Sequence, residues 1–261
     1  MISNLLRKAK KAPWVLSQPL TNKPSDPLAV ISDLFIWRDH QEWNTYFELL
    51  DLSSLFGDND EHQVDIVFFD DNGNQFHQQS VELNGLHRQV LEISKLLSAL
   101  DQLPCDYGTF SIFHQKVPDS VLSLESFIAE RGYVSYQYKN TPLRSYVHGN
   151  LDAIDDSLMP LCGSSLLGRL YNLQYLLEPN KSYEIALTNA SSVNKKTIFQ
   201  VVDYNGIKQI EKCTTLKPKQ VFVFSIEDLS IVSRLIIKSK MIMARPVVFC
   251  FNNDNMDVFH G

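Results

Sequence analysis

The fold is decided by one stretch of the sequence, Ile66-Val67-Phe68-Phe69-Asp70-Asp71-Asn72-Gly73, in which a short apolar run meets an Asn-Gly turn. Gly supplies a positive φ at such a turn and Asn tolerates one, so the run is typical of a strand entering a β-hairpin. The same pattern returns later in the chain as Ile198-Phe199-Gln200-Val201-Val202-Asp203-Tyr204-Asn205-Gly206. The two turns are 133 residues apart, since 203 − 70 = 133.

The same offset extends beyond the turns without a gap. It carries Leu83 onto Leu216 and Val90 onto Val223, and it also carries Ile93 onto Ile226 and Leu96 onto Leu229. Several matches in one ungapped register indicate an internal repeat.

Short strand patterns with turn signals between them occupy both halves. In the first half they lie near 46–49, 66–69, 90–93, 110–113 and 133–138, and in the second near 183–187, 198–202, 221–226, 234–238 and 246–251. The sequence therefore predicts a mostly-β chain of two tandem antiparallel β-sandwich units, the first of them with a helical insertion. The expected boundaries are a basic helix and Pro-rich linker over 1–28, the first unit over 29–150, a linker over 151–169 and the second unit over 170–261.

This pattern resembles the immunoglobulin-like class of β-sandwich. The residues that carry the resemblance are 183–189, the 203–206 hairpin, Leu216-Lys217-Pro218 and the strand that follows. It covers most of 181–251 and, more loosely, 34–140, and it lacks the Cys…Trp…Cys pattern of antibody-type domains. The resemblance implies a binding or spacer role more often than catalysis, although a fold does not fix a function.

Charge and cysteine content narrow the function classes. The formal net charge is −6, which disfavours a protein dedicated to nucleic acid. The four cysteines include no CxxC pair, so a structural zinc site is not expected, and a reduced, cytoplasmic setting fits them. No cofactor is predicted. A bridge between Cys213 and Cys250 stays open, because both fall in predicted strands.

The N-terminal arm is basic. Residues 2–11 place apolar side chains at helical spacing beside four Lys and Arg residues, which predicts a short amphipathic helix. Its function is either weak contact with a membrane surface or partner, or simple packing on its own domain. No apolar run approaches the roughly 20 residues that cross a bilayer, so no transmembrane segment is expected, and the basic residues argue against a signal peptide.

The first half departs from the second after its fourth predicted strand. Pro118-Asp119-Ser120 opens a predicted helix that Gly132 can close. The aromatic strand over 133–138 follows it and leads into a polar segment, 139–150, and this polar-aromatic cluster has no counterpart in the second half.

This polar-aromatic segment is the candidate site. Arg144, Tyr146 and His148 alternate, so in an extended chain they point to one side. Arg, Tyr, His and Asn side chains together can bind a sugar, a carboxylate or a phosphate. The alternative is that the tyrosines are half-buried packing residues and that residues 148–150 only make a turn. The predicted ligand-binding residues are Tyr136, Tyr138, Arg144, Tyr146, His148 and Asn150.

The leading functional hypothesis is a non-catalytic binding or assembly protein whose first unit binds a glycan or a partner protein. An enzyme is the alternative, either a hydrolase or a metal-dependent oxygenase, with His148, His114 and Arg144 in its site. The metal would then take His114 and His148 with Asp39 or His40 as a further ligand. A structural subunit of a larger assembly is the third hypothesis, and the oligomeric state is left open.

Overall fold

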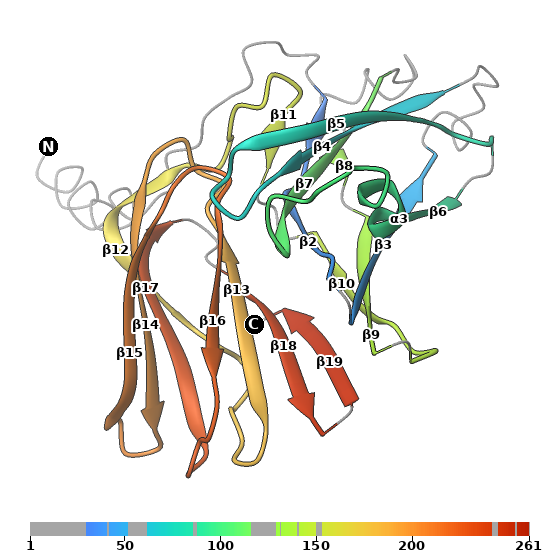
Figure 1. Ribbon diagram of the computed structural model, residues 1–261. Coiled ribbons are helices and arrows are strands. Elements are labelled where there is room, and N and C mark those ends of the chain that lie inside the picture. The colour runs from blue at the N-terminus through green and yellow to red at the C-terminus, as the bar shows by residue number, and fades with distance from the viewer. Residues whose placement is uncertain are drawn as a thin grey trace, which may run out of the picture.

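The structure is a computed structural model that describes residues 30–40, 42–51, 62–85, 88–115, 129–130, 132–139, 141–149, 153–241, 245–253 and 255–260. Over these residues the chain is mostly β and forms several antiparallel sheets, which confirms the predicted fold class (Figure 1). The N-terminal arm and most of the predicted helical insertion lie outside the described residues.

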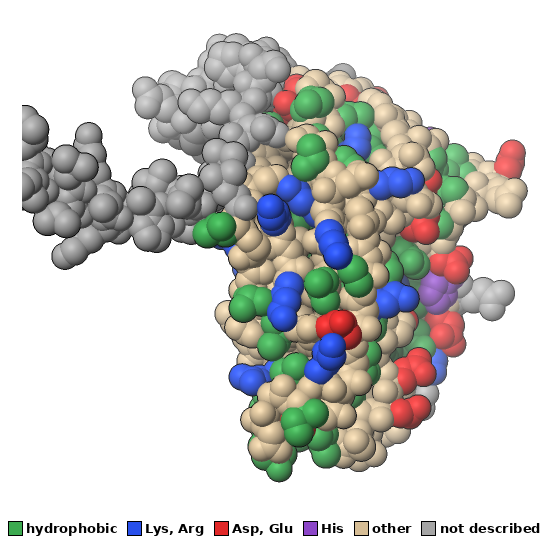
Figure 2. Space-filling view, turned by 90° about the vertical axis from the view of Figure 1, so that its left-hand side faces the viewer, with side chains coloured by type: hydrophobic (Ala, Val, Ile, Leu, Met, Phe, Trp, Pro, Cys, Tyr) green, Lys and Arg blue, Asp and Glu red, His purple; other side chains and the backbone are tan. Residues whose placement is uncertain are grey.

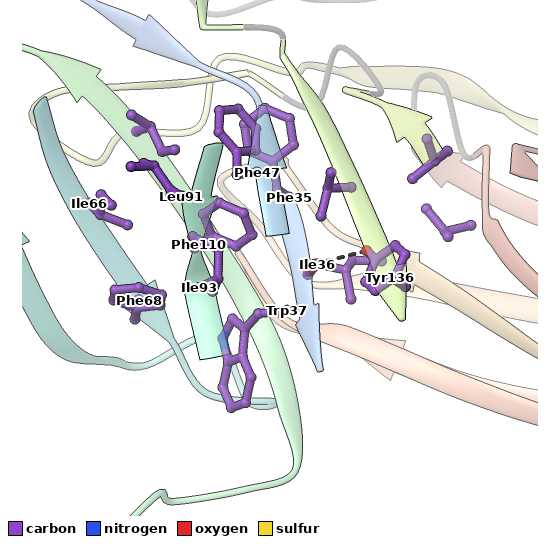
Figure 3. Close-up of a cluster of buried hydrophobic side chains, with 14 of the residues drawn as sticks. Phe35, Ile36, Trp37, Phe47, Ile66, Phe68, Leu91, Ile93, Phe110 and Tyr136 are labelled. Carbon is purple, nitrogen blue, oxygen red and sulfur yellow. Dashed lines mark hydrogen bonds between the residues drawn. The ribbon is translucent and has the colours of Figure 1, made fainter. Parts of the chain in front are cut away.

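Two four-stranded sheets form the first unit, on the right of Figure 1. Their inner faces pack together, with the ring of Phe35 4.6 Å from that of Phe47 and Phe47 5.7 Å from Phe110 (Figure 3). Fully burying such a side chain contributes about 1.5–3 kcal/mol. In sheet order, one sheet holds β2 (Phe35–Arg38), β7 (Tyr107–His114), β4 (Gln63–Phe69) and β5 (Gln75–Glu82), and the other β10 (Ser145–His148), β9 (Tyr133–Tyr138), β3 (Trp43–Leu50) and β6 (Arg88–Glu92).

The second unit, on the left of Figure 1, also has two four-stranded sheets. Phe199 lies between them, 5.4 Å from Phe224. In sheet order, one sheet holds β12 (Ser164–Asn172), β17 (Ser233–Met241), β14 (Lys195–Asp203) and β15 (Lys208–Leu216), and the other β16 (Val221–Ile226), β13 (Ser182–Thr188), β18 (Val247–Asn252) and β19 (Asn255–His260).

The sheet orders of the two units correspond strand by strand when β2 is matched with β12 and β3 with β13. The hairpin between β4 and β5 has a register shift at Phe68/Phe69, and the hairpin between β14 and β15 has one at Val201/Val202, again 133 residues on.

The two hairpin turns also share their hydrogen bonds. Asp70 Oδ1 accepts from the backbone N–H groups of Asn72 and Asn74 over 2.9 and 2.8 Å. Asp203 Oδ1 accepts from the N–H groups of Asn205 and Ile207 over the same two distances. In each turn the Asp carboxylate therefore caps backbone N–H groups of the loop, and the Gly three residues later adopts the positive φ that the turn requires.

Three features differ from the sequence expectations. A short helix, α3 (Ile93–Leu97), follows β6, where a strand was expected to run through Ile93. A three-stranded sheet of β11 (Ile154–Asp155), β1 (Ile31–Ser32) and β8 (Ala129–Glu130) covers part of the first unit. The segment 151–169, expected to be a linker, holds β11 and the first part of β12.

The two units share a continuous core. The cluster that fills the first sandwich includes Ala186, Val247 and Phe249 of the second unit. The 70–73 turn lies against the loop before β16, where a Cβ on Gly73 would stand 2.3 Å from the Pro218 carbonyl oxygen. Thr109 Oγ1 donates to the Lys219 carbonyl over 3.0 Å in the same region. The units are therefore held as one packed body.

All four cysteines are free, so the open question of a Cys213–Cys250 bridge is answered by its absence. Within the described ranges no helix combines the length and the apolar character needed to cross a membrane.

Candidate functional site

Strands β9 and β10 place the predicted site residues on two opposite faces of one sheet. Tyr146 pairs with Ser135 and His148 with Tyr133, and these four side chains share the outer face. Tyr136 pairs with Ser145 and so belongs to the inner face. The predicted alternation of Tyr146 and His148 thus gives outward-facing side chains on β10, and Arg144 lies just before this strand.

We call the outward-facing set Tyr46, Tyr133, Arg144, Tyr146 and His148 the tyrosine face. Its centre is Arg144, whose guanidinium carbon lies 3.5 Å from the centroid of the Tyr46 ring, a cation–π contact. No described carboxylate forms an ion pair with Arg144. Its planar donors therefore remain available to an anionic group of a ligand.

The polar floor of this face is fixed by Gln137. The Tyr46 hydroxyl donates to Gln137 Oε1 over 3.0 Å, and the Gln137 amide nitrogen donates to the Thr141 carbonyl. Asn44 Nδ2 reaches the same Oε1 atom at 3.4 Å. These bonds hold the Tyr46 ring in the orientation on which Arg144 stacks.

A buried hydroxyl lies within the tyrosine face. Ser135 pairs with Tyr46 on one side and Tyr146 on the other, and its exposed fraction is 0%. Its Oγ atom has no hydrogen-bond partner. A buried polar group without a partner costs about 1–3 kcal/mol, so this hydroxyl is an unsatisfied group beneath the face rather than on its surface.

The assignment of Tyr136 to the ligand surface is wrong. Its side chain is fully buried, it lies 5.0 Å from the Phe249 ring, and its hydroxyl donates to the Ile36 carbonyl over 2.8 Å (Figure 3). Burial raises the pKa of this phenol above its usual value. Tyr136 is a core residue between the two units.

Tyr138 also lies on the inner side of the sheet. Its ring lies 4.9 Å from Trp43 and 5.5 Å from Phe251, and its hydroxyl donates to Glu42 Oε2 over 3.0 Å. Burial, and then the Glu42 carboxylate, raise the Tyr138 pKa. It seals the edge of the contact between units, which matches the alternative that these tyrosines pack. Asn150 lies outside the described residues.

His148 connects the tyrosine face to the second unit. Its Nδ1 atom lies 2.6 Å from the Gly149 carbonyl oxygen, and its ring lies 4.6 Å from that of His260. His260 is half-buried, Nε2 bonds the His148 carbonyl, and burial, as the largest cause, lowers the His260 pKa to about 4. The imidazole of His260 is therefore neutral near pH 7.

The histidines considered for a metal do not meet. His114 lies in the first unit with His62, its Nδ1 atom 3.0 Å from His62 Nε2, whereas His148 faces His260. His40 lies beside Trp43, with the ring centroids 6.0 Å apart. No group of three or more His, Cys, Asp or Glu side chains suited to a metal occurs among the described residues.

Apart from the tyrosine face, an open depression of about 530 Å³ lies at one end of the second unit. Its lining is polar, but its cation, Lys181, is already paired with Glu178 over 2.8 Å. Phe251 is its one ring among the described residues that line it, so it offers a ligand less than the tyrosine face does.

Four residues of the site were not predicted from the sequence: Tyr46, Tyr133, Ser135 and Gln137. The signal for three of them was in β9 itself, because residues 133, 135 and 137 alternate with 134, 136 and 138. Tyr46 comes from β3, far along the chain, and only the sheet pairing brings it beside Ser135.

No family model matches the chain, and no curated protein matches it. Two solved structures are similar to it at 10% identity over 87% of the chain: a β-glucuronidase from glycoside hydrolase family 2, with a TM-score of 0.19, and a mutant VP2 protein of infectious bursal disease virus in derived T=1 particles, with a TM-score of 0.17. The chain spans 23% of the glucuronidase and 54% of VP2. Likeness at this level leaves the function to be argued from the site.

Proposed function

We propose that this chain is a non-catalytic binding protein whose tyrosine face binds a glycan that carries an anionic group. The observation that carries the proposal is the Arg144 guanidinium, which stacks on Tyr46 without an ion pair to any described residue. A cation held in place on a ring loses little conformational freedom when it meets a carboxylate, so its hydrogen bonds add to affinity.

The neighbouring side chains suit a sugar. Tyr133 and Tyr146 are exposed, and each offers an apolar ring with a hydroxyl at its tip. The ring can lie against the C–H groups of a pyranose while the hydroxyls around it exchange hydrogen bonds with the sugar.

The same geometry supports binding rather than hydrolysis. A serine nucleophile needs a general base within hydrogen-bond reach. Ser135 Oγ makes no such bond, and the neighbouring His148 Nδ1 lies 2.6 Å from its own Gly149 carbonyl. The described groups of the face can orient a polar ligand without activating one another.

The tyrosine face belongs to only one of the two units. We infer that the two units are immunoglobulin-like sandwiches that arose by duplication, supported by the ungapped offset of 133 and by the corresponding sheet orders. The first copy then gained the aromatic outer face of β9 and β10. The equivalent strands of the second unit, β18 and β19, carry no Arg beside a Tyr.

The test is a glycan array probed with the full chain and with three variants. Arg144→Ala should weaken binding to carboxylated glycans by about 10- to 150-fold, the value of one charge-assisted hydrogen bond. Tyr146→Ala should weaken binding to acidic and neutral sugars alike. Tyr204→Ala is the matched control, because this tyrosine is 78% exposed in the hairpin between β14 and β15 of the second unit.

Two results would contradict the proposal. One is an array on which the wild-type chain binds no glycan above background. The other is a glycan whose binding falls as much with Tyr204→Ala as with Tyr146→Ala. Such a result would mean that the glycan binds outside the tyrosine face or binds without specificity.

A further inference from the structure

The outer face of the sheet β12-β17-β14-β15 is basic. Alternate residues of β14 and β17, such as Phe199 and Ile237, enter the core, so the residues between them point outward. Figure 2 looks onto this side of the molecule and shows Lys and Arg side chains spread across it. We define the basic face as Lys196, Lys208, Arg234, Lys238 and Lys240.

Almost no acid offsets these cations. The four strands carry two carboxylates, Asp203 and Glu211. Asp203 is buried and caps the hairpin, and Glu211 is paired with Lys208 over 3.0 Å. The face is therefore positive in a chain whose formal net charge is −6.

The cations are close enough to affect one another. Thr197 pairs with Ser239, which sets Lys196 beside Lys240 across the strands. Burial, and then the charge of Lys240, lower the pKa of the adjacent Lys195. Such crowding of like charge is costly in a free protein and is relieved when an anionic surface approaches.

The equivalent face of the first unit is covered by the chain itself. There Val67 and Phe69 lie buried with Leu34, Phe113 and Ile154, beneath β1 and β11. The offset of 133 places Gln200 and Val202 at the positions of Val67 and Phe69. No third sheet of the described residues covers the second unit, and although Val202 is buried, Leu170 of β12 is 64% exposed beside the lysines.

We propose that the basic face is a docking surface for an anionic lipid membrane. An open sheet with spaced cations and exposed aliphatic side chains, Leu167 and Leu170, matches a headgroup layer, where lysines meet phosphates and aliphatic groups enter the interface. Single-stranded nucleic acid would favour stacking aromatic rings, and the outward positions defined here carry none. A membrane bound here would leave the tyrosine face free. The sheet β12-β17-β14-β15 lies on the left of Figure 1, whereas the sheet β10-β9-β3-β6, which carries the tyrosine face, lies on the right.

The N-terminal sequence adds cations of the same sign, Arg7, Lys8, Lys10 and Lys11. Their contribution must be separated from that of the basic face. Two sets of variants do so, one that neutralises the face and one that neutralises these four residues.

The experiment is co-sedimentation of the full chain with vesicles of phosphatidylcholine alone or with a rising fraction of phosphatidylglycerol. The wild type should bind only the anionic vesicles, and added salt should release it. Lys196→Gln/Lys238→Gln/Lys240→Gln should weaken binding by roughly fivefold per cation, about a hundredfold in all. The matched control, Lys95→Gln/Lys139→Gln/Lys217→Gln, removes the same charge elsewhere and should change little.

Single Lys240→Glu serves if the triple variant melts early, and it should still lower binding more than Lys95→Glu. The proposal is overturned if face and control variants bind equally, or if only neutralisation of residues 7–11 abolishes binding. It is also overturned if duplex DNA displaces the vesicles at equal salt, or if low salt yields a self-associated chain that ignores vesicles. None of these outcomes bears on glycan binding at the tyrosine face.

Discussion

Arg38 of the first unit forms an ion pair with Glu184 of the second, and its guanidinium carbon lies 3.9 Å from the centroid of the Trp43 ring. The same guanidinium lies 4.7 Å from Phe249. Arg38 is 7% exposed and Glu184 29% exposed, so a charged pair is enclosed at the contact between the units.

This pair predicts an asymmetric mutational response. Glu184→Ala strands a buried cation and should lower the free energy of unfolding by about 2–3 kcal/mol. The double variant Arg38→Met/Glu184→Leu removes both charges and should lie within about 1 kcal/mol of the wild type. Urea denaturation measures both, and a double variant less stable than Glu184→Ala would show that the pair itself stabilises the contact.

The two hairpin glycines should differ in their tolerance of alanine. Both have positive φ, +81° at Gly73 and +80° at Gly206, so each alanine suffers about 1–2 kcal/mol of left-handed strain. At Gly206 nothing lies within 4 Å of the new Cβ, whereas at Gly73 the Pro218 carbonyl oxygen stands 2.3 Å away. Gly73→Ala should therefore cost clearly more in thermal denaturation, and equal losses would mean that the 70–73 turn does not dock on the second unit.

Substitution of Tyr136 should affect stability, whereas substitution of Tyr146 should affect glycan binding. Tyr136→Phe removes the hydroxyl that donates to Ile36 and should cost about 1 kcal/mol of folding free energy. It should leave glycan affinity unchanged. Tyr146→Phe, on the exposed side, should leave the melting temperature unchanged and weaken a glycan that bonds its hydroxyl. A Tyr136→Phe protein with normal stability and impaired binding would reverse our placement of the two residues.

His260 should make the stability depend on pH. Its pKa falls from an ordinary 6.5 to about 4 on folding, so between these values the unfolded chain binds more protons. The free energy of unfolding should therefore fall as the pH drops from about 6.5 to about 4, by at most about 3–4 kcal/mol. His260→Gln should flatten this slope relative to the wild type in pH-dependent urea denaturation, and an unchanged slope would exclude His260 as its source.

Much of the strand pattern was predictable from local sequence. Both Asn-Gly turns, the strands before and after them and the later strands near 110 and 234 follow from apolar runs bounded by turn residues. Helix α3 was not predictable, because Ile93 and Leu97 suit a strand or a helix equally until packing decides. The pairing of β1 with β8 and β11 also joins two-residue strands that carry no periodic signal.

The candidate site was predicted in part. Alternation fixed the common direction of Tyr146 and His148, and the structure places Arg144 on the same face, over Tyr46. The error over Tyr136 and Tyr138 arose because β9 has tyrosines on both faces, and sequence alone did not say which face was covered. The presence of Phe249 and Phe251 from the second unit answered that question.

By itself the sequence determined the local units of this protein: the two capped hairpins, the repeat offset, the alternation of strand residues and the total charge. These properties depend on residues that are close in the chain, because turn residues set the hairpins and side chains alternate with a period of two along a strand. Only the tertiary structure decided which faces are buried, that Tyr46 would underlie Arg144, and that the lysines of β14 and β17 would gather on the outer face of one sheet. Those outcomes depend on contacts between residues far apart in the chain, and sequence spacing does not encode the partner that a sheet face will meet.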